Sequence, residues 1–231
     1  MTISFNANLL PQSPTPEYVA WVDVMGIQSS MSRSLNVSGN FIFKLHIAAL
    51  QSTHTNVSLY PIMDGLYATS ATQQDMLTFL RELFSSIADE FINATRPEFR
   101  FIIRGALAYG PVIHGNSVPA NISFSQAFQD NQLYKDSILL GLPMIQANQS
   151  EKNAPPFGIF VHESARSFAP QNQPPIHHVW WKWGTQQNQN WNGLKQTLSQ
   201  HFTWCKQHSS EILYDPIRIA AHEEMSNQYF A

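Results

Sequence analysis

The chain has 231 residues, of which 43% are hydrophobic and 13% are charged, and its formal net charge at pH 7 is -3. This length and apolar content are enough for a full hydrophobic core and exclude global disorder. The absence of a net positive charge argues against nucleic-acid binding through a broad basic surface. The single cysteine, Cys205, excludes an internal disulfide and a cysteine-based zinc site. We see no signal peptide and no apolar run near the roughly 18 residues of a membrane span, so we expect a cytoplasmic protein with no membrane partner.

The first half of the chain predicts strands alternating with helices. The expected elements are an extended arm at 1–16, a buried strand at 17–25, helical residues at 27–51 with an interruption at Gly39, strands at 57–63 and 66–70, and a helix at 72–94. The helix at 72–94 is the clearest of these, because its apolar residues recur with a period near 3.6. Asp64 and Gly65 lie between the two short strands, which is typical of a hairpin turn.

The second half continues this alternation. We expect a strand from Phe99 to Tyr109, helices at 121–135 and 141–152, a strand at 158–162, a loop at 170–175, an aromatic strand at 177–183, a helix at 191–207, and a further short helix or arm at 215–229. The order of elements predicts an α+β, ferredoxin-like fold with a central, mostly antiparallel sheet and flanking helices. We expect residues 17–231 to form one domain whose C-terminal part is a helical extension.

Two aspartates point to chemistry. Asp23 lies in an apolar strand, where a carboxylate costs several kcal/mol to bury unless it is paired. Asp64 lies at the predicted hairpin turn. Two carboxylates that converge from separate strands provide the oxygen ligands for a pair of Mg²⁺ ions, as phosphoryl chemistry requires. Each has a simpler interpretation: Asp23 satisfies turn amides, and Asp64 is an ordinary hairpin residue.

Three segments, in this order and spacing, resemble the class III nucleotide cyclase catalytic domain. They are Trp21-Val22-Asp23-Val24-Met25-Gly26, Ile62-Met63-Asp64-Gly65-Leu66-Tyr67 and Arg104-Gly105-Ala106-Leu107-Ala108-Tyr109-Gly110-Pro111-Val112, with a weaker match at 141–151 followed by 156–161. The resemblance implies that Asp23 and Asp64 hold two Mg²⁺ or Mn²⁺ ions, with the Val24 carbonyl as a further ligand. It also implies that Arg104 contacts a triphosphate. A structural ion pair of Arg104, or a role for Arg100 in its place, remains open.

The resemblance further implies a phosphate site at the turn formed by Met25, Gly26 and Ile27, because this turn leads into a helix N-terminus. The position that reads the purine in adenylate and guanylate cyclases is Tyr60. The positions of the transition-state Asn and Arg fall on Ile145 and Gln149. The metal motif is therefore present and the purine motif is missing. This combination resembles the bacterial pyrimidine cyclases of the Pycsar anti-phage system.

That resemblance implies a homodimer that converts UTP, or less favourably CTP, to the 3′,5′-cyclic monophosphate. The product would act as a second messenger on a separate effector protein. Tyr60 would narrow the base pocket, although it is also compatible with an ordinary half-buried aromatic residue. Gln149 or Gln146 would replace family residues, and Lys182 would bind phosphate or lie on the surface. Two alternatives remain: an adenylate cyclase with an altered base pocket, and an inactive cyclase-like module that binds a nucleotide and regulates a partner.

Overall fold

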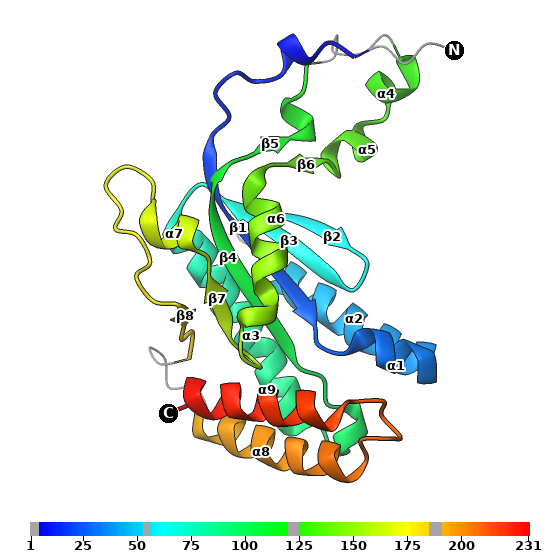
Figure 1. Ribbon diagram of the computed structural model, residues 1–231. Helices are drawn as coiled ribbons and strands as arrows, with labels where there is room; N and C mark the ends of the chain where they lie inside the picture. The colour runs from blue at the N-terminus through cyan, green and yellow to red at the C-terminus, as the bar shows by residue number, and fades with distance from the viewer. Residues whose placement is uncertain (1–4, 53–55, 120–124, 185–190) are drawn as a thin grey trace.

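The structure is a computed structural model that describes residues 5–52, 56–119, 125–184 and 191–231. Its centre is a six-stranded sheet in the order β2-β3-β1-β4-β7-β8 (Figure 1). These strands are β1 (Pro16–Val24), β2 (Ser58–Ile62), β3 (Gly65–Ser70), β4 (Ile103–Pro111), β7 (Ile159–Val161) and β8 (Trp180–Trp181). The β4–β7 pair is parallel and the other neighbours are antiparallel. The predicted α+β fold with a mostly antiparallel sheet is therefore confirmed.

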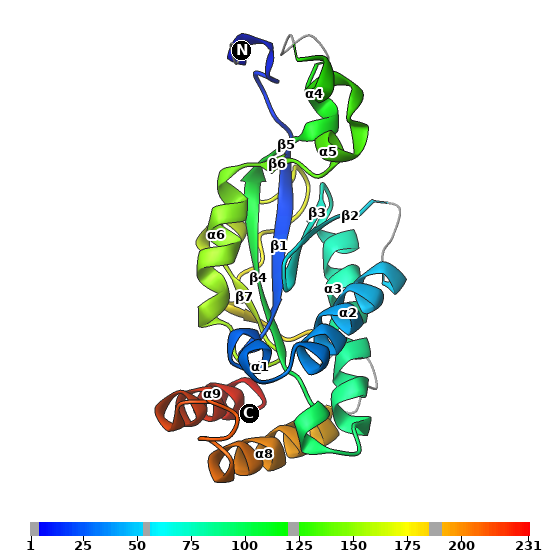
Figure 2. The ribbon, with the colours of Figure 1, turned by 90° about the vertical axis from the view of Figure 1, so that its right-hand side faces the viewer.

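Helices cover both faces of this sheet. Figure 2 shows α2 (Leu35–Gln51) and α3 (Gln73–Asn93) on one face and α6 (Leu142–Ser150) on the other. Because side chains alternate along a strand, β1 serves both layers. Its residues Tyr18, Ala20 and Val22 belong to the larger core under α2 and α3. Val19 and Trp21 belong to a smaller cluster on the α6 side.

Two C-terminal helices pack together at one end of the molecule. They are α8 (Trp191–Gln207) and α9 (Pro216–Tyr229), and α8 also contacts α3. Helix α9 starts sharply because Asp215 accepts hydrogen bonds from the amides of Ile217 and Arg218, at 2.8 and 3.1 Å. The views in Figures 1 and 2 place this pair at the same end of the sheet as α1 (Ile27–Arg33).

A small lobe projects from the opposite end of the sheet (Figures 1 and 2). It contains a two-stranded sheet of β5 (Ile113–His114) and β6 (Leu139–Leu140), followed along the lobe by α4 (Gln126–Asp130) and α5 (Gln132–Asp136). Neither α4 nor α5 has a buried residue. These two helices therefore contribute no buried side chain to a core of the lobe. The remaining helix, α7 (Glu163–Ser167), packs near β4.

Several sequence-based boundaries were wrong. The helical stretch at 27–51 breaks at Ser34, whose hydroxyl caps α2 by accepting from the Val37 amide at 3.3 Å, and Gly39 continues the helix. Strand β4 starts at Ile103, since Pro97–Phe99 forms a 3₁₀ turn. The aromatic strand expected at 177–183 is reduced to Trp180–Trp181.

The helix expected at 121–135 lies partly outside the described residues, and its described part forms the two short helices α4 and α5. Over the part of the chain that the structure covers, none of the helices has both the length and the apolar character needed to cross a membrane.

Candidate functional site

The carboxyl groups of Asp23 and Asp64 converge at one end of the sheet, although 40 residues separate them in the chain. Asp23 is the second-last residue of β1 and lies opposite Gly65 of β3. Asp64 occupies the turn that joins β2 to β3, directly before Gly65. The hairpin can lie this close to β1 because position 65 has no side chain: a Cβ there would lie 2.7 Å from the Trp21 ring. Sheet register and this close approach together set the position of the pair.

The charge of Asp64 acts on Asp23. Burial and, to a smaller extent, the negative charges of Asp64 and Glu151 raise the pKa of Asp23 from 3.8 to about 7. A hydrogen bond from the Val24 amide to Asp23 Oδ1, at 2.8 Å, and the charge of Arg104 act in the opposite direction. The net effect is an acidic centre in which negative charge is incompletely balanced by the protein.

Such a centre suits a hard divalent cation. Carboxylate and carbonyl oxygens are the ligands that Mg²⁺ and Mn²⁺ prefer, and a bound cation would offset the repulsion that raises the pKa of Asp23. Val24 is the last residue of β1 and adjoins Asp23, so the ligand that it would provide is its backbone carbonyl oxygen. Within the described ranges, no group of three or more His, Cys, Asp or Glu side chains is placed to hold a metal. The protein ligands for a cation at this site are therefore two carboxylates and backbone carbonyl oxygens.

Arg104 is engaged by a carboxylate that the sequence analysis did not identify. It lies opposite Asp23 on β4, and its guanidinium donates to both oxygens of Glu151, with an Nη2–Oε2 distance of 3.1 Å. The side chains of Arg104 and Glu151 are only 13% and 10% exposed. Burial raises the pKa of Glu151, and the charge of Arg104 opposes that effect. Glu151 directly follows α6 and lies in the segment at 141–151 that resembles the cyclase family. This position was the sequence signal that could have identified it as a site residue.

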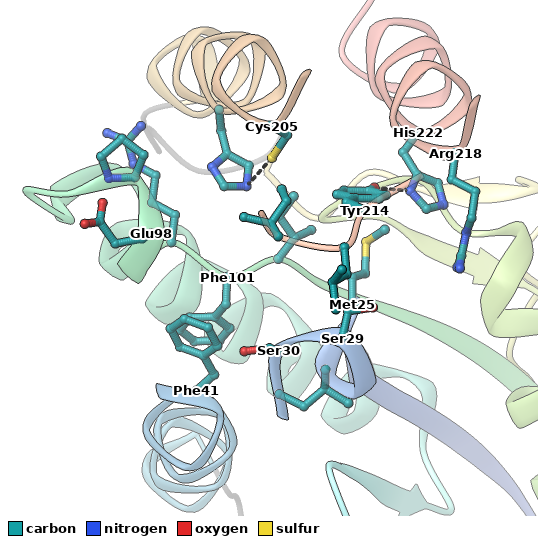
Figure 3. Close-up of a pocket in the computed structure, with 18 of the residues that line it drawn as sticks. Met25, Ser29, Ser30, Phe41, Glu98, Phe101, Cys205, Tyr214, Arg218 and His222 are labelled. Atoms are coloured by element: carbon teal, nitrogen blue, oxygen red, sulfur yellow. Dashed lines mark hydrogen bonds between the residues drawn. The ribbon is translucent and has the colours of Figure 1, made fainter. Parts of the chain in front are cut away.

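The predicted phosphate turn lies beside a cavity of about 190 Å³ (Figure 3). Met25, Gly26 and Ile27 line this cavity together with Arg104. Gly26 has φ of +72°, in the left-handed region that glycine adopts readily. The Met25 amide already donates to the Ile102 carbonyl at 2.8 Å, and α1 has only seven residues, so its dipole is short. The turn alone is therefore a weaker anion site than the sequence suggested.

Tyr60 lies on the α6 side of the sheet, like Trp21. It is buried, and its hydroxyl contacts His114 Nδ1. His114 Nε2 lies 2.9 Å from Glu17 Oε1, so a polar chain joins β2, β5 and the start of β1. Burial raises the pKa of Tyr60 to about 12, which keeps the phenol neutral. Tyr60 therefore has a structural partner within the chain.

The remaining predicted residues lie away from the aspartates or on the surface. Gln149 is exposed on α6, and so is Ile145, which is 54% exposed. Gln146 is half-buried. Lys182 follows β8, which β4 and β7 separate from β1, and its amino group donates to the Ala231 carbonyl at 3.2 Å. Within one chain, the structure does not bring Lys182 to Asp23.

Comparison with known proteins identifies the fold class. The sequence matches no protein-family profile and no curated protein. Among solved structures, a double mutant of the guanylyl cyclase domain of the RhoGC fusion protein from the aquatic fungus Blastocladiella emersonii is similar, with a TM-score of 0.50 and 15% identity over 67% of this chain and 83% of that chain.

Two further cyclases show weaker likeness. The guanylate cyclase domain of RhGC from Catenaria anguillulae in complex with GTP has a TM-score of 0.48 and 14% identity, over 67% of this chain and 81% of that chain. A bacterial light-regulated adenylyl cyclase has a TM-score of 0.47 and 14% identity, over 62% of this chain and 71% of that chain. The chain thus has the fold of a class III nucleotide cyclase catalytic domain.

Proposed function

We propose that this protein is a pyrimidine nucleotide cyclase that converts UTP, or less favourably CTP, to its 3′,5′-cyclic monophosphate and pyrophosphate. The observation that carries this proposal is the convergence of Asp23 and Asp64, whose interaction helps to raise the pKa of Asp23 to about 7. Two partly buried carboxylates that repel each other, one near a strand end and one at a hairpin tip, have a clear use in binding cations. The likeness to the fold of a guanylyl cyclase domain supports nucleotide cyclisation as the reaction for which these cations would be used.

Asp23, Asp64 and the Val24 carbonyl would hold the Mg²⁺ or Mn²⁺ ions. Bound cations would lower the pKa of the attacking ribose 3′-hydroxyl and neutralise charge on the triphosphate. The protein's own part is to set geometry. The β1–β3 register fixes the separation of the carboxylates, and the Val24 amide orients Asp23. Arg104 adds positive charge at the same place, although Glu151 already shares its guanidinium.

The preference for a pyrimidine rests on Tyr60 and on the motif resemblance. A tyrosine occupies more of a pocket than the lysine or glutamate of purine cyclases, so a smaller base is favoured. The contact with His114 holds the phenol in one position, which makes steric selection more effective than it would be with a mobile side chain. Gln149 and Lys182 would bind the substrate in the site of the other subunit of a homodimer.

A homodimer is consistent with the surface of the chain. Leu142 and Ile145 expose 61% and 54% of their area on α6, and Met63 at the hairpin tip exposes 87%. Large exposed apolar side chains are typical of protein interfaces when they form a contiguous patch. A partner subunit would cover them and supply residues that one chain lacks. We further propose, from the motif resemblance, that the product is a second messenger in anti-phage defence that acts through a separate effector protein.

The decisive experiment is incubation of the purified protein with each of the four nucleoside triphosphates and Mn²⁺, with products read by mass. The proposal predicts cyclic UMP, with less cyclic CMP. ATP as the preferred substrate would instead establish the adenylate cyclase alternative. A protein that binds nucleotides and forms no cyclic product would establish the regulatory module. The pairing of Arg104 with Glu151 is the observation that favours this last candidate, because it reduces the charge available for a triphosphate.

A further inference from the structure

The cavity beside the β1–α1 turn is built from distant parts of the chain. One side is formed by Met25, Ile27 and Arg33, and the opposite side by residues of α8, α9 and their connection. Figure 3 shows Arg218 and His222 extending from α9, and Tyr214 near Met25. Tyr214 and His222 are hydrogen-bonded to each other. The C-terminal helices, which lie beyond the segments that resemble cyclases, thus form a wall of this cavity.

Positive charge dominates the lining. Four arginines contribute to it: Arg33, Arg100, Arg104 and Arg218. The lining also contains two acids, and both are engaged elsewhere. Glu98 accepts from Arg96 Nε at 2.8 Å, and Asp215 accepts from the first amides of α9. An anion that entered this cavity would therefore meet little competing negative charge.

Two of these arginines have no polar partner among the residues that the structure describes. Across the described residues, neither Arg33 nor Arg218 forms a side-chain hydrogen bond or an ion pair. Two buried atoms of lining residues, Arg100 Nε and His201 Nδ1, also lack a hydrogen-bond partner within that part of the chain. Buried polar atoms without partners are uncommon in native proteins, and a bound ion is one explanation for them. The cavity thus combines two exposed guanidinium groups, those of Arg33 and Arg218, with two buried nitrogen atoms to which an anion could bind.

The size of the cavity limits its occupant. Its volume of about 190 Å³ is below the roughly 300–1,000 Å³ of pockets that enclose a drug-sized ligand. A whole nucleotide does not fit, whereas a phosphate chain does. Arg104 connects this cavity to the carboxylate centre, since it lines the cavity and lies opposite Asp23 in the β1–β4 pairing. A nucleotide whose reacting phosphorus lay at Asp23 would direct its outer phosphates into this cavity.

We propose that Arg218 of α9 and Arg33 of α1 bind the β- and γ-phosphates of the nucleoside triphosphate, and the pyrophosphate that leaves. This inference rests on the proposed function and adds to it two phosphate-binding residues, one of them from the C-terminal extension. Guanidinium groups suit the task, because each donates two parallel hydrogen bonds to a phosphate. Arg218 would have the phosphate-binding role that the sequence analysis suggested for Lys182. The Lys182 amino group instead donates to the Ala231 carbonyl.

The test is calorimetric titration of the full chain with inorganic pyrophosphate in the presence of Mg²⁺. We expect Arg218→Gln and Arg33→Gln each to weaken binding by about tenfold or more, as loss of a charge-assisted hydrogen bond predicts. Arg218→Lys should retain part of the affinity. The matched control is Arg166→Gln on α7, which removes the same charge away from the cavity and should leave the affinity within about twofold. Unchanged circular dichroism and melting temperature verify that the variants fold.

The possible results separate the two proposals. If the wild type makes a cyclic nucleotide and Arg218→Gln binds pyrophosphate with wild-type affinity, the phosphate role of Arg218 is wrong while the cyclase proposal stands. Equal loss in Arg166→Gln, or no pyrophosphate binding by the wild type, would likewise overturn it. If the wild type makes no cyclic product but pyrophosphate binding depends on Arg218 and Arg33, the anion site stands and the cyclase proposal fails.

Discussion

Arg104 and Glu151 form a buried ion pair directly beside Asp23, so one guanidinium links the acidic centre to the structure of α6. The Nη2–Oε2 distance is 3.1 Å, and both side chains are nearly inaccessible to solvent. Removing one partner of a buried pair leaves an uncompensated charge. This pair therefore makes the local fold and the electrostatics of the candidate site depend on each other.

Glu151→Ala is expected to destabilise the protein strongly, by about 3–5 kcal/mol, because it leaves Arg104 buried and unpaired. The free energy of unfolding from a urea titration measures the effect. The double substitution Arg104→Met with Glu151→Leu should recover most of that loss, since it removes both charges and keeps the volume. Equal instability of the single and double variants would show that the pair contributes through packing alone.

Asp23→Asn and Asp64→Asn should each reduce formation of the cyclic nucleotide by at least about 100-fold, because each removes an anionic ligand of the cations. Product is quantified by mass with Mn²⁺ present. Thermal denaturation with and without Mn²⁺ gives a second measurement: the cation should raise the melting temperature of the wild type and have little effect on either variant. Asp89→Asn, an exposed change on α3, is the control. Full activity in Asp23→Asn would exclude its proposed metal role.

Without divalent cations, stability should fall as pH rises from about 4 to 7. The folded pKa of Asp23, about 7, lies above its ordinary value of 3.8, so the native state retains a proton that the unfolded state has released. Asp23→Asn, which cannot ionise, should therefore stabilise the protein by about 2 kcal/mol at pH 8 and by less at pH 5. Urea titrations at the two pH values test this. The same gain at both would mean that titration of Asp23 is not the cause.

Two glycine substitutions should have opposite effects. A Cβ at Gly65 would lie 2.7 Å from the Trp21 ring and the Val22 carbonyl, so Gly65→Ala should cost about 1–3 kcal/mol and displace the hairpin that carries Asp64. Gly39 lies inside α2 with no atom within 4 Å of the added Cβ, so Gly39→Ala should stabilise by about 0.5–1 kcal/mol. Melting temperatures and cyclase activity distinguish them. Normal activity in Gly65→Ala would argue against dependence of the site on this contact.

Tyr60 allows the ring and the hydroxyl to be tested separately. Tyr60→Phe removes the hydroxyl contact to His114 Nδ1 and should cost about 1 kcal/mol, but it keeps the ring and hence the pyrimidine preference. Tyr60→Ala should admit purines and lower the ratio of UTP to ATP turnover, because it opens the base pocket. Competition assays with both triphosphates measure that ratio. An unchanged ratio in Tyr60→Ala would remove Tyr60 from base selection.

From the amino-acid sequence we could predict most of the order of strands and helices, the hairpin at Asp64-Gly65 and the apolar strand that carries Asp23. These features depend on local periodicity and on turn chemistry, which are written in neighbouring residues. Even there, the break at Ser34 and the shortness of β8 were missed, because capping and pairing depend on the surroundings of a segment.

The partners of the functional side chains depend on how distant segments pack together. Arg104 meets Glu151 across 47 residues, Tyr60 meets His114 across 54, and His114 meets Glu17 across 97. No local pattern encodes such pairs, because they arise when sheet register and helix packing bring separate segments together. For the same reason, the wall that α9 places beside the β1–α1 turn could not be foreseen from the sequence. Packing of the C-terminal helices, and not any motif, puts Arg218 at that cavity.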